Sequence, residues 1–241
     1  DGTTSVLQCV GVGQGSLSGA LTTASNGSIG IGYEAGKAVT AGTNSEENTL
    51  IGNLAGTALT VGDGNVAVGA SALDAEIAGT KTTAIGHNAL SGQSNAGNID
   101  ARNTAVGYSS GLSLTTGTNN VIVGANAFAT PSGDEDDNVA VGTYAMMSCD
   151  EGAGDTIDNN IAIGTSALTG GAATITNTIA IGYQAADGTG AIDSTDNIFI
   201  GSQAGGGSWT SSTSTQNVGI GTNVLDAAMN NANGNVAIGH N

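Results

Sequence analysis

The chain has 241 residues, of which 41 are glycine, one is proline and 3% are aromatic. Its 20 Asp and Glu against three Lys and Arg give a formal net charge of −17, which excludes nucleic acid as a partner because phosphate binding needs a basic surface. The same charge disfavours direct binding to anionic membranes, and this glycine content would indicate disorder unless a regular apolar pattern overruled it.

The N-terminal residues 1–7 show no initiator Met, no basic segment and no apolar core, so we see no signal peptide. No apolar run in the chain approaches the length of a membrane helix, and we expect no membrane insertion. The sequence stops at residue 241 in the middle of a repeat, and neither end carries the polar cap that solenoids need. We therefore expect a fragment of a longer fibre or a subunit on which another subunit stacks.

A short unit, written NVAVGASAL at residues 65–73, is repeated along nearly the whole chain. Its glycine recurs with a period of roughly 19 residues and slack on either side, which is the signature of a solenoid. We expect residues 1–241 to form one all-β repeat domain, a parallel β-solenoid of about 13 coils of roughly 19 residues. The glycines are Gly13, Gly32, Gly52, Gly69, Gly86, Gly107, Gly124, Gly142, Gly164, Gly182, Gly201, Gly221 and Gly239.

Two β-branched residues precede each glycine, separated by one residue, as Val66 and Val68 are. Residues spaced by two lie on the same face of a strand, and β-branched side chains favour strands. The pattern therefore predicts a short strand in every repeat, with its β-branched face packed inside the coil.

The residue between the two β-branched positions is Ala or Gly in ten of the 13 repeats and is never charged. A solvated face would carry polar residues, so we expect this face to be buried as well, against identical chains in a closed symmetric ring. The stripe that we expect to contact sister chains is Ala67, Ala84, Ala105, Ala140, Ala162, Ala180 and Ala237.

Asparagine opens the strand in nine of the 13 repeats. Stacked from coil to coil, such residues can form a ladder of side-chain amides along the axis. The glycine that follows the strand predicts a corner with positive φ or a close approach of two backbones. Pairs such as Ala72 and Leu73 come after the corner and predict a second inward anchor.

Loops of variable length separate the repeats and carry most of the acidic residues, as expected of surface loops. Hard oxygen ligands on stacked loops can bind Ca²⁺, although the chain has no EF-hand loop and a solvated acidic rim is the simpler interpretation. The weak Ca²⁺ candidates are Asp134, Asp136, Asp137, Asp155 and Asp158.

The residue directly after the glycine varies between aromatic and polar types, which predicts an outward-facing column. Tyr33, Tyr108 and Tyr183 lie in this column and are candidates to face a ligand, with ordinary surface tyrosines as the alternative. His87 and His240 share the column many coils apart, so they are not a metal pair.

Cys9 and Cys149 are seven repeats apart, on the order of 30 Å along the axis, and cannot pair within one chain. They are either two thiols or, at Cys9, an interchain bridge. No spacing suggests a catalytic triad, a Cys/His pair or a carboxylate dyad. We therefore expect no enzyme, no catalytic residue and no cofactor apart from the possible Ca²⁺.

Residues 65–69 (NVAVG), 160–168 (NIAIGTSAL) and 179–185 (IAIGYQA) resemble the head repeat of trimeric autotransporter adhesins and similar repeats of phage and viral tail fibres. The resemblance covers almost the whole chain and implies a left-handed β-roll, three copies of which associate around one axis. Two features depart from the adhesins: their head repeat is shorter, and their neck, coiled-coil stalk and membrane anchor are missing here.

Together these patterns predict a non-enzymatic, extracellular, homotrimeric segment of an attachment fibre, on a bacterial cell surface or a virion. Its variable loops would bind a host-cell or surface receptor, either glycan or protein, since function resides in sites grafted on the scaffold. The alternatives are a structural filament whose subunits stack end to end and, less favoured, an ice-binding solenoid, which needs a flat array of threonines.

Overall fold

The computed structural model describes residues 8–19, 26–40, 45–131, 133–149, 156–170, 174–188, 193–207, 209, 212–227, 229 and 231–241. These residues form strands, turns and loops, and no helix among them could span a membrane. The chain divides into two compact units, residues 1–116 and 117–241, which are described separately. Each is a parallel β-solenoid, which confirms the predicted fold class.

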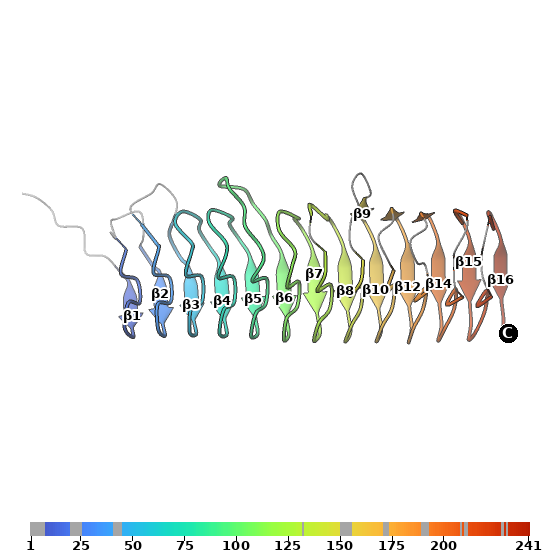
Figure 1. Cartoon of the computed structure of the whole chain (residues 1–241), viewed down its shortest axis with the longest axis horizontal. Helices are drawn as coiled ribbons and strands as arrows, with labels where there is room; N and C mark the ends of the chain where they lie inside the picture. The colour runs from blue at the N-terminus through green and yellow to red at the C-terminus, as the bar shows by residue number, and fades with distance from the viewer. Residues whose placement is uncertain are drawn as a thin grey trace, which may run out of the picture. The chain divides into compact units, whose positions relative to one another are not determined.

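The described residues of the first unit form six three-residue strands, each at a predicted repeat. Figure 1 shows these strands side by side in chain order. Every strand pairs in parallel with the next without any shift in register, so that Val66, Ala67 and Val68 lie opposite Thr83, Ala84 and Ile85. The same holds for the other pairs. The strands are β1 (Val10–Val12), β2 (Ile29–Ile31), β3 (Thr49–Ile51), β4 (Val66–Val68), β5 (Thr83–Ile85) and β6 (Thr104–Val106).

The second unit continues the pattern with β7 (Val121–Val123), β8 (Val139–Val141), β10 (Ile161–Ile163), β12 (Ile179–Ile181), β14 (Ile198–Ile200), β15 (Val218–Ile220) and β16 (Val236–Ile238). These strands also pair in parallel and in register. A second sheet, in the order β13-β11-β9, consists of β9 (Ile157–Asp158), β11 (Ile175–Thr176) and β13 (Ser194–Thr195). The repeat pattern did not predict it, because a two-residue strand has no periodicity.

The predicted orientation of the main strands is wrong. The central residues point into the coil: Ala67, Ala84, Ala105, Ala140, Ala162 and Ala180 are completely buried in their own chain, and Ala237 in the last strand is half-buried. The β-branched residues on either side are half-buried or exposed. A sister chain therefore cannot pack along the alanine stripe.

The physical reason for the small central residue lies inside the coil. A Cβ added to Gly30 would lie 2.7 Å from Leu17 Cγ and from Ser16 Oγ. Leu17 is the fourth residue after its glycine, the anchor position that the sequence predicted to point inward. Its counterparts Leu73, Leu90, Phe128, Met146 and Leu168 are completely buried, which confirms that prediction. Because the anchors fill the interior, most coils have room for only a methyl group at the centre of the strand.

The asparagine ladder is confirmed and lies in the core. The Asn138 backbone N–H donates to Asn120 Oδ1 at 2.9 Å, and the Asn160 N–H donates to Asn138 Oδ1 at 3.0 Å. Asn138 Nδ2 donates in turn to the Ile157 carbonyl of the following coil at 2.7 Å. The first unit repeats the arrangement with Asn48 and Asn65. Each buried amide thus satisfies polar groups of its neighbours, as buried polar groups must.

The glycines of successive coils stack in a column, and at each of these glycines the backbone lies very close to the backbone of the next coil. Their φ angles lie between +128° and +149°, a backbone conformation that residues with a Cβ rarely adopt. A Cβ on Gly69 would lie 2.4 Å from the Gly86 carbonyl oxygen, and a Cβ on Gly164 would lie 2.3 Å from that of Gly182. Both predicted reasons for the glycine therefore apply at once.

This packing predicts that Gly69→Ala destabilises the first unit by roughly 1–3 kcal/mol, because a side chain would clash with the next coil and strain the backbone. Gly97→Ala is the matched control, since its Cβ would have its nearest neighbour at 3.9 Å. Urea unfolding followed by circular dichroism would measure both variants. Equal midpoints for the two would contradict the proposed role of the glycine column.

Candidate functional site

One candidate surface is the outer face of the main strands, which we call the aliphatic face. It consists of the first and last residues of β1–β6 in the first unit, and of β7, β8, β10, β12, β14, β15 and β16 in the second. Every one of these residues is Val, Ile or Thr, and none is charged. The unshifted register stacks them into two continuous columns in each unit.

Side chains of the aliphatic face remain accessible in the single chain. Ile85 and Ile163 expose more than a third of their surface, and Val12 exposes 56%. Parallel sheets are normally covered on both faces. A contiguous apolar surface that a folded chain leaves open marks an interaction site.

The acidic candidates are brought together only in part. Asp158 Oδ1 accepts the Asp136 backbone N–H at 2.8 Å, and Asp136 Oδ1 accepts the Thr118 backbone N–H at 2.5 Å and its hydroxyl at 2.9 Å. Each carboxylate thus bonds to the preceding coil. Asp134 and Asp137 are exposed on the same loop, and Asp155 lies outside the described residues.

No group of three or more His, Cys, Asp or Glu within the described part of the chain is placed to hold a metal ion. Partial burial raises the pKa of Asp158, and the negative charges of Asp136, Asp134 and Asp137 add to this effect. The described geometry is therefore that of a crowded acidic loop with its oxygens bonded to backbone. Calcium binding stays a prediction.

The tyrosine column faces outward, as predicted. Tyr33, Tyr108 and Tyr183 expose 46%, 56% and 54% of their surface. Tyr108 stacks on His87 of the preceding coil, with ring centroids 5.5 Å apart and planes within 8°. The column thus offers aromatic surface, and its role in ligand contact stays a prediction.

The three basic side chains of the chain are all paired with carboxylates. Lys37 contacts Glu34 at 3.0 Å, and both Lys81 and Arg102 contact Asp100. The hydrogen bond from Lys81 is the main cause that lowers the pKa of Asp100 to about 2. That nucleic acid is not a partner stays a prediction.

The burial of the Cys149 thiol and of the Glu76 carboxylate is explained by their hydrogen bonds within the chain. Burial raises the pKa of the Cys149 thiol to about 12, and its Sγ donates to the Leu168 carbonyl at 2.9 Å, which favours the protonated thiol. Glu76, which sequence analysis missed, is completely buried and accepts hydrogen bonds from the backbone that follows it and from Gln93 and Asn95. Cys9 is half-buried in the first unit.

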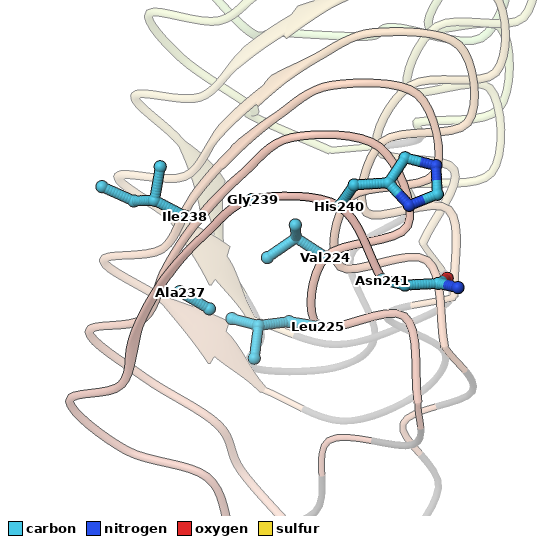
Figure 2. A pocket seen from close by; sticks show the side chains of 7 residues that line it. All are labelled: Val224, Leu225, Ala237, Ile238, Gly239, His240 and Asn241. Atoms are coloured by element: carbon cyan, nitrogen blue, oxygen red, sulfur yellow. The ribbon is translucent and has the colours of Figure 1, made fainter.

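A hollow of about 290 Å³ lies over the last coil, and Figure 2 shows its lining. Ala237 and Ile238 of β16 form one side, and Val224 and Leu225 of the preceding corner form another. The equivalents of Ala237 and Leu225 in other coils, such as Ala162 and Leu168, are completely buried, whereas equivalents of Ile238 such as Ile163 are exposed. The hollow thus combines inner and outer positions of one coil, and we assign no ligand to it.

The acidic loop predicts that Asp158→Asn raises the thermal midpoint at pH 7. The substitution keeps an oxygen to accept the Asp136 N–H and removes the repelled charge. Since the folded pKa of Asp158 is raised, its stabilising contribution is complete below the ordinary Asp pKa and is lost as pH rises through the folded pKa. The gain should therefore vanish in acid below about pH 3.8, as calorimetry at several pH values would show; a lower midpoint at pH 7 would contradict it.

Comparison of the chain with protein-family models, with curated protein sequences and with solved structures gave no match.

Proposed function

We propose that this chain is a segment of an extracellular attachment fibre, in which three copies assemble through the aliphatic face and present loops to a receptor on a host cell or surface. The observation that carries the proposal is the accessible aliphatic face. The alanine stripe, which sequence analysis selected for assembly, has no part in it because it is buried within each chain.

Copies of the same chain are the partner that fits this face best. A column of Val and Ile repeated at every coil matches another such column in the same register, which is the self-complementarity that a symmetric oligomer needs. A formal charge of −17 makes copies repel one another elsewhere, and the aliphatic face is the uncharged surface across which they can approach. Burying these side chains contributes roughly 25 cal/mol for each Å² removed from water.

The number three comes from the resemblance of the repeats to trimeric adhesin heads. The chemistry of the face itself supports self-assembly in general. It also argues against ice binding, because in the second unit both columns contain only Val and Ile, where a threonine array is needed.

The loops would provide recognition while the core stays constant. The glycine column, the asparagine ladder and the anchors fix the path of every coil, whereas the spacing between glycines changes from coil to coil. It is short from Gly52 to Gly69, for example, and long from Gly142 to Gly164. Loops that vary on a rigid scaffold are the usual place for binding residues. The attachment function rests on this division between constant core and variable loops.

The test is the solution mass of the chain by multi-angle light scattering. A trimer has three times the chain mass of 23.1 kDa. The double variant Ile163→Glu/Ile181→Glu should give 23.1 kDa with an unchanged circular dichroism spectrum. Both residues lie on the aliphatic face, in strands that pair directly.

The matched control is Thr165→Glu, which places the same charge on an exposed residue two positions beyond Ile163 and outside the aliphatic face. Its mass should equal that of the unchanged chain. A mass of 23.1 kDa for the unchanged chain at all concentrations would reject self-assembly. A mass that grows without limit with concentration would favour the end-to-end filament.

A further inference from the structure

A hollow of about 470 Å³ lies on the second unit, between the corners of two successive coils. Tyr144, Met147 and Ser148 line it from the corner after β8, and Ser166 and Thr169 line it from the corner after β10. Tyr144 and Ser166 occupy equivalent repeat positions, two residues after the glycine. Met147 and Thr169 are likewise equivalent, five residues after it. The hollow is therefore made by stacking and cannot be seen in a single repeat.

Tyr144 has an unusual conformation for its residue type. Its φ of +61° lies in the left-handed region, which bulky side chains rarely adopt. At the same repeat position, Asn88, Asn126 and Asn223 carry the short polar side chain that this conformation favours. Burial stabilises the Tyr144 ring only in part, because 42% of the residue's surface is exposed. The fold imposes this conformation at the repeat position, because Leu54, Gln184 and Gln203 adopt it too. Tyr144 is therefore set apart by an exposed aromatic ring at a position where other coils carry aliphatic or polar side chains.

The lining is uncharged, whereas four other coils carry a charged residue at the same corner. The fifth residue after the glycine is acidic at Asp74, Asp187 and Asp226, and Lys37 at that position pairs with Glu34. Here Met147 and Thr169 take its place. A cationic ligand would find no carboxylate in this lining, and an anionic ligand would be repelled by a chain of net charge −17. The hollow therefore favours a neutral ligand.

The remaining chemistry of the lining is one aromatic ring, one thioether and three aliphatic hydroxyl groups. Hydroxyl groups both donate and accept hydrogen bonds, and a tyrosine ring offers a flat apolar surface with a polar tip. A neutral sugar ring has the complementary features, since it carries apolar C–H groups on one face and hydroxyls around its edge. A volume of about 470 Å³ lies in the range of small-molecule sites.

We propose that this hollow binds a neutral hexopyranose unit of a glycan, with the apolar face of the sugar on the Tyr144 ring and its hydroxyls paired with Ser166 and Thr169. The inference rests on the proposed attachment function, for which it names the receptor class. It also assigns recognition to a corner that differs from the predicted column of Tyr33, Tyr108 and Tyr183.

The test is saturation-transfer NMR on the unchanged chain with the methyl glycosides of mannose, galactose, glucose and N-acetylglucosamine. At least one should bind with a dissociation constant on the order of millimolar. Methyl glucuronide, which carries a carboxylate, should bind at least several-fold more weakly. No transfer to any neutral glycoside, or stronger binding of the glucuronide, would overturn the proposal.

Two variants separate binding from folding. Tyr144→Asn introduces the residue found at Asn126 and Asn223, so it should lower sugar affinity at least tenfold while the thermal midpoint stays equal or rises. Ser166→Ala should weaken binding by a few-fold. Tyr183→Asn, at an exposed tyrosine outside the hollow, should leave binding unchanged. Binding that survives Tyr144→Asn, or is lost equally in Tyr183→Asn, would overturn the assignment.

The result is independent of the test of assembly. Sugar binding by a chain whose mass stays at 23.1 kDa would reject the trimeric fibre and keep the hollow. An assembly of three times that mass without sugar binding would keep the fibre and reject the hollow.

Discussion

Within each unit, every described coil is joined to the next by backbone hydrogen bonds without any shift in register, and this constraint determines most of the structure. Gly69 N–H, for example, donates to the Ile51 carbonyl of the preceding strand at 2.8 Å, while its α-carbon approaches the Gly86 carbonyl too closely for a side chain. Unshifted stacking places like residues on like. A property of one repeat therefore becomes a column: amides in the core, alanines beside them, and aliphatic side chains on the outer face.

The strand positions, the glycine corners, the anchors and the asparagine ladder could be predicted because each follows from a residue type at a fixed repeat position. The orientation of the strand could not be read from alternation, which separates two faces without saying which is inside. Side-chain size contains that information. Phe199, large at the central position, is matched by Gly205 at the anchor position of its coil, where a Cβ would lie 2.5 Å from the Phe199 ring. Leu50 and Gly56 show the same exchange, so both positions share one interior.

Sites could be predicted from the sequence only where a single repeat contains all of their residues, and not where two stacked repeats form them together. The exposure of Tyr33, Tyr108 and Tyr183 follows from their shared column, whereas the hollow at Tyr144 requires two corners at once. The second sheet arises from loop segments too short to show a period, and Glu76 is buried where other coils place Leu59 or Leu114. Features that two neighbouring coils form together could be identified only from the structure. The charges follow the repeat positions as well: the acidic residues lie mostly in the loops, and the aliphatic face carries no charge.

The central claim is that the alanine side of each strand lies inside its own coil and the aliphatic side is covered by other copies. Thiol labelling of Ala162→Cys and Ile163→Cys, each combined with Cys9→Ser and Cys149→Ser, tests it most directly. The account predicts that the thiol at 162 stays unlabelled in every folded state, and that the thiol at 163 is protected in the assembly and labelled once the assembly is dissociated by dilution. Rapid labelling at 162 in the folded chain, with protection at 163 after dissociation, would contradict it.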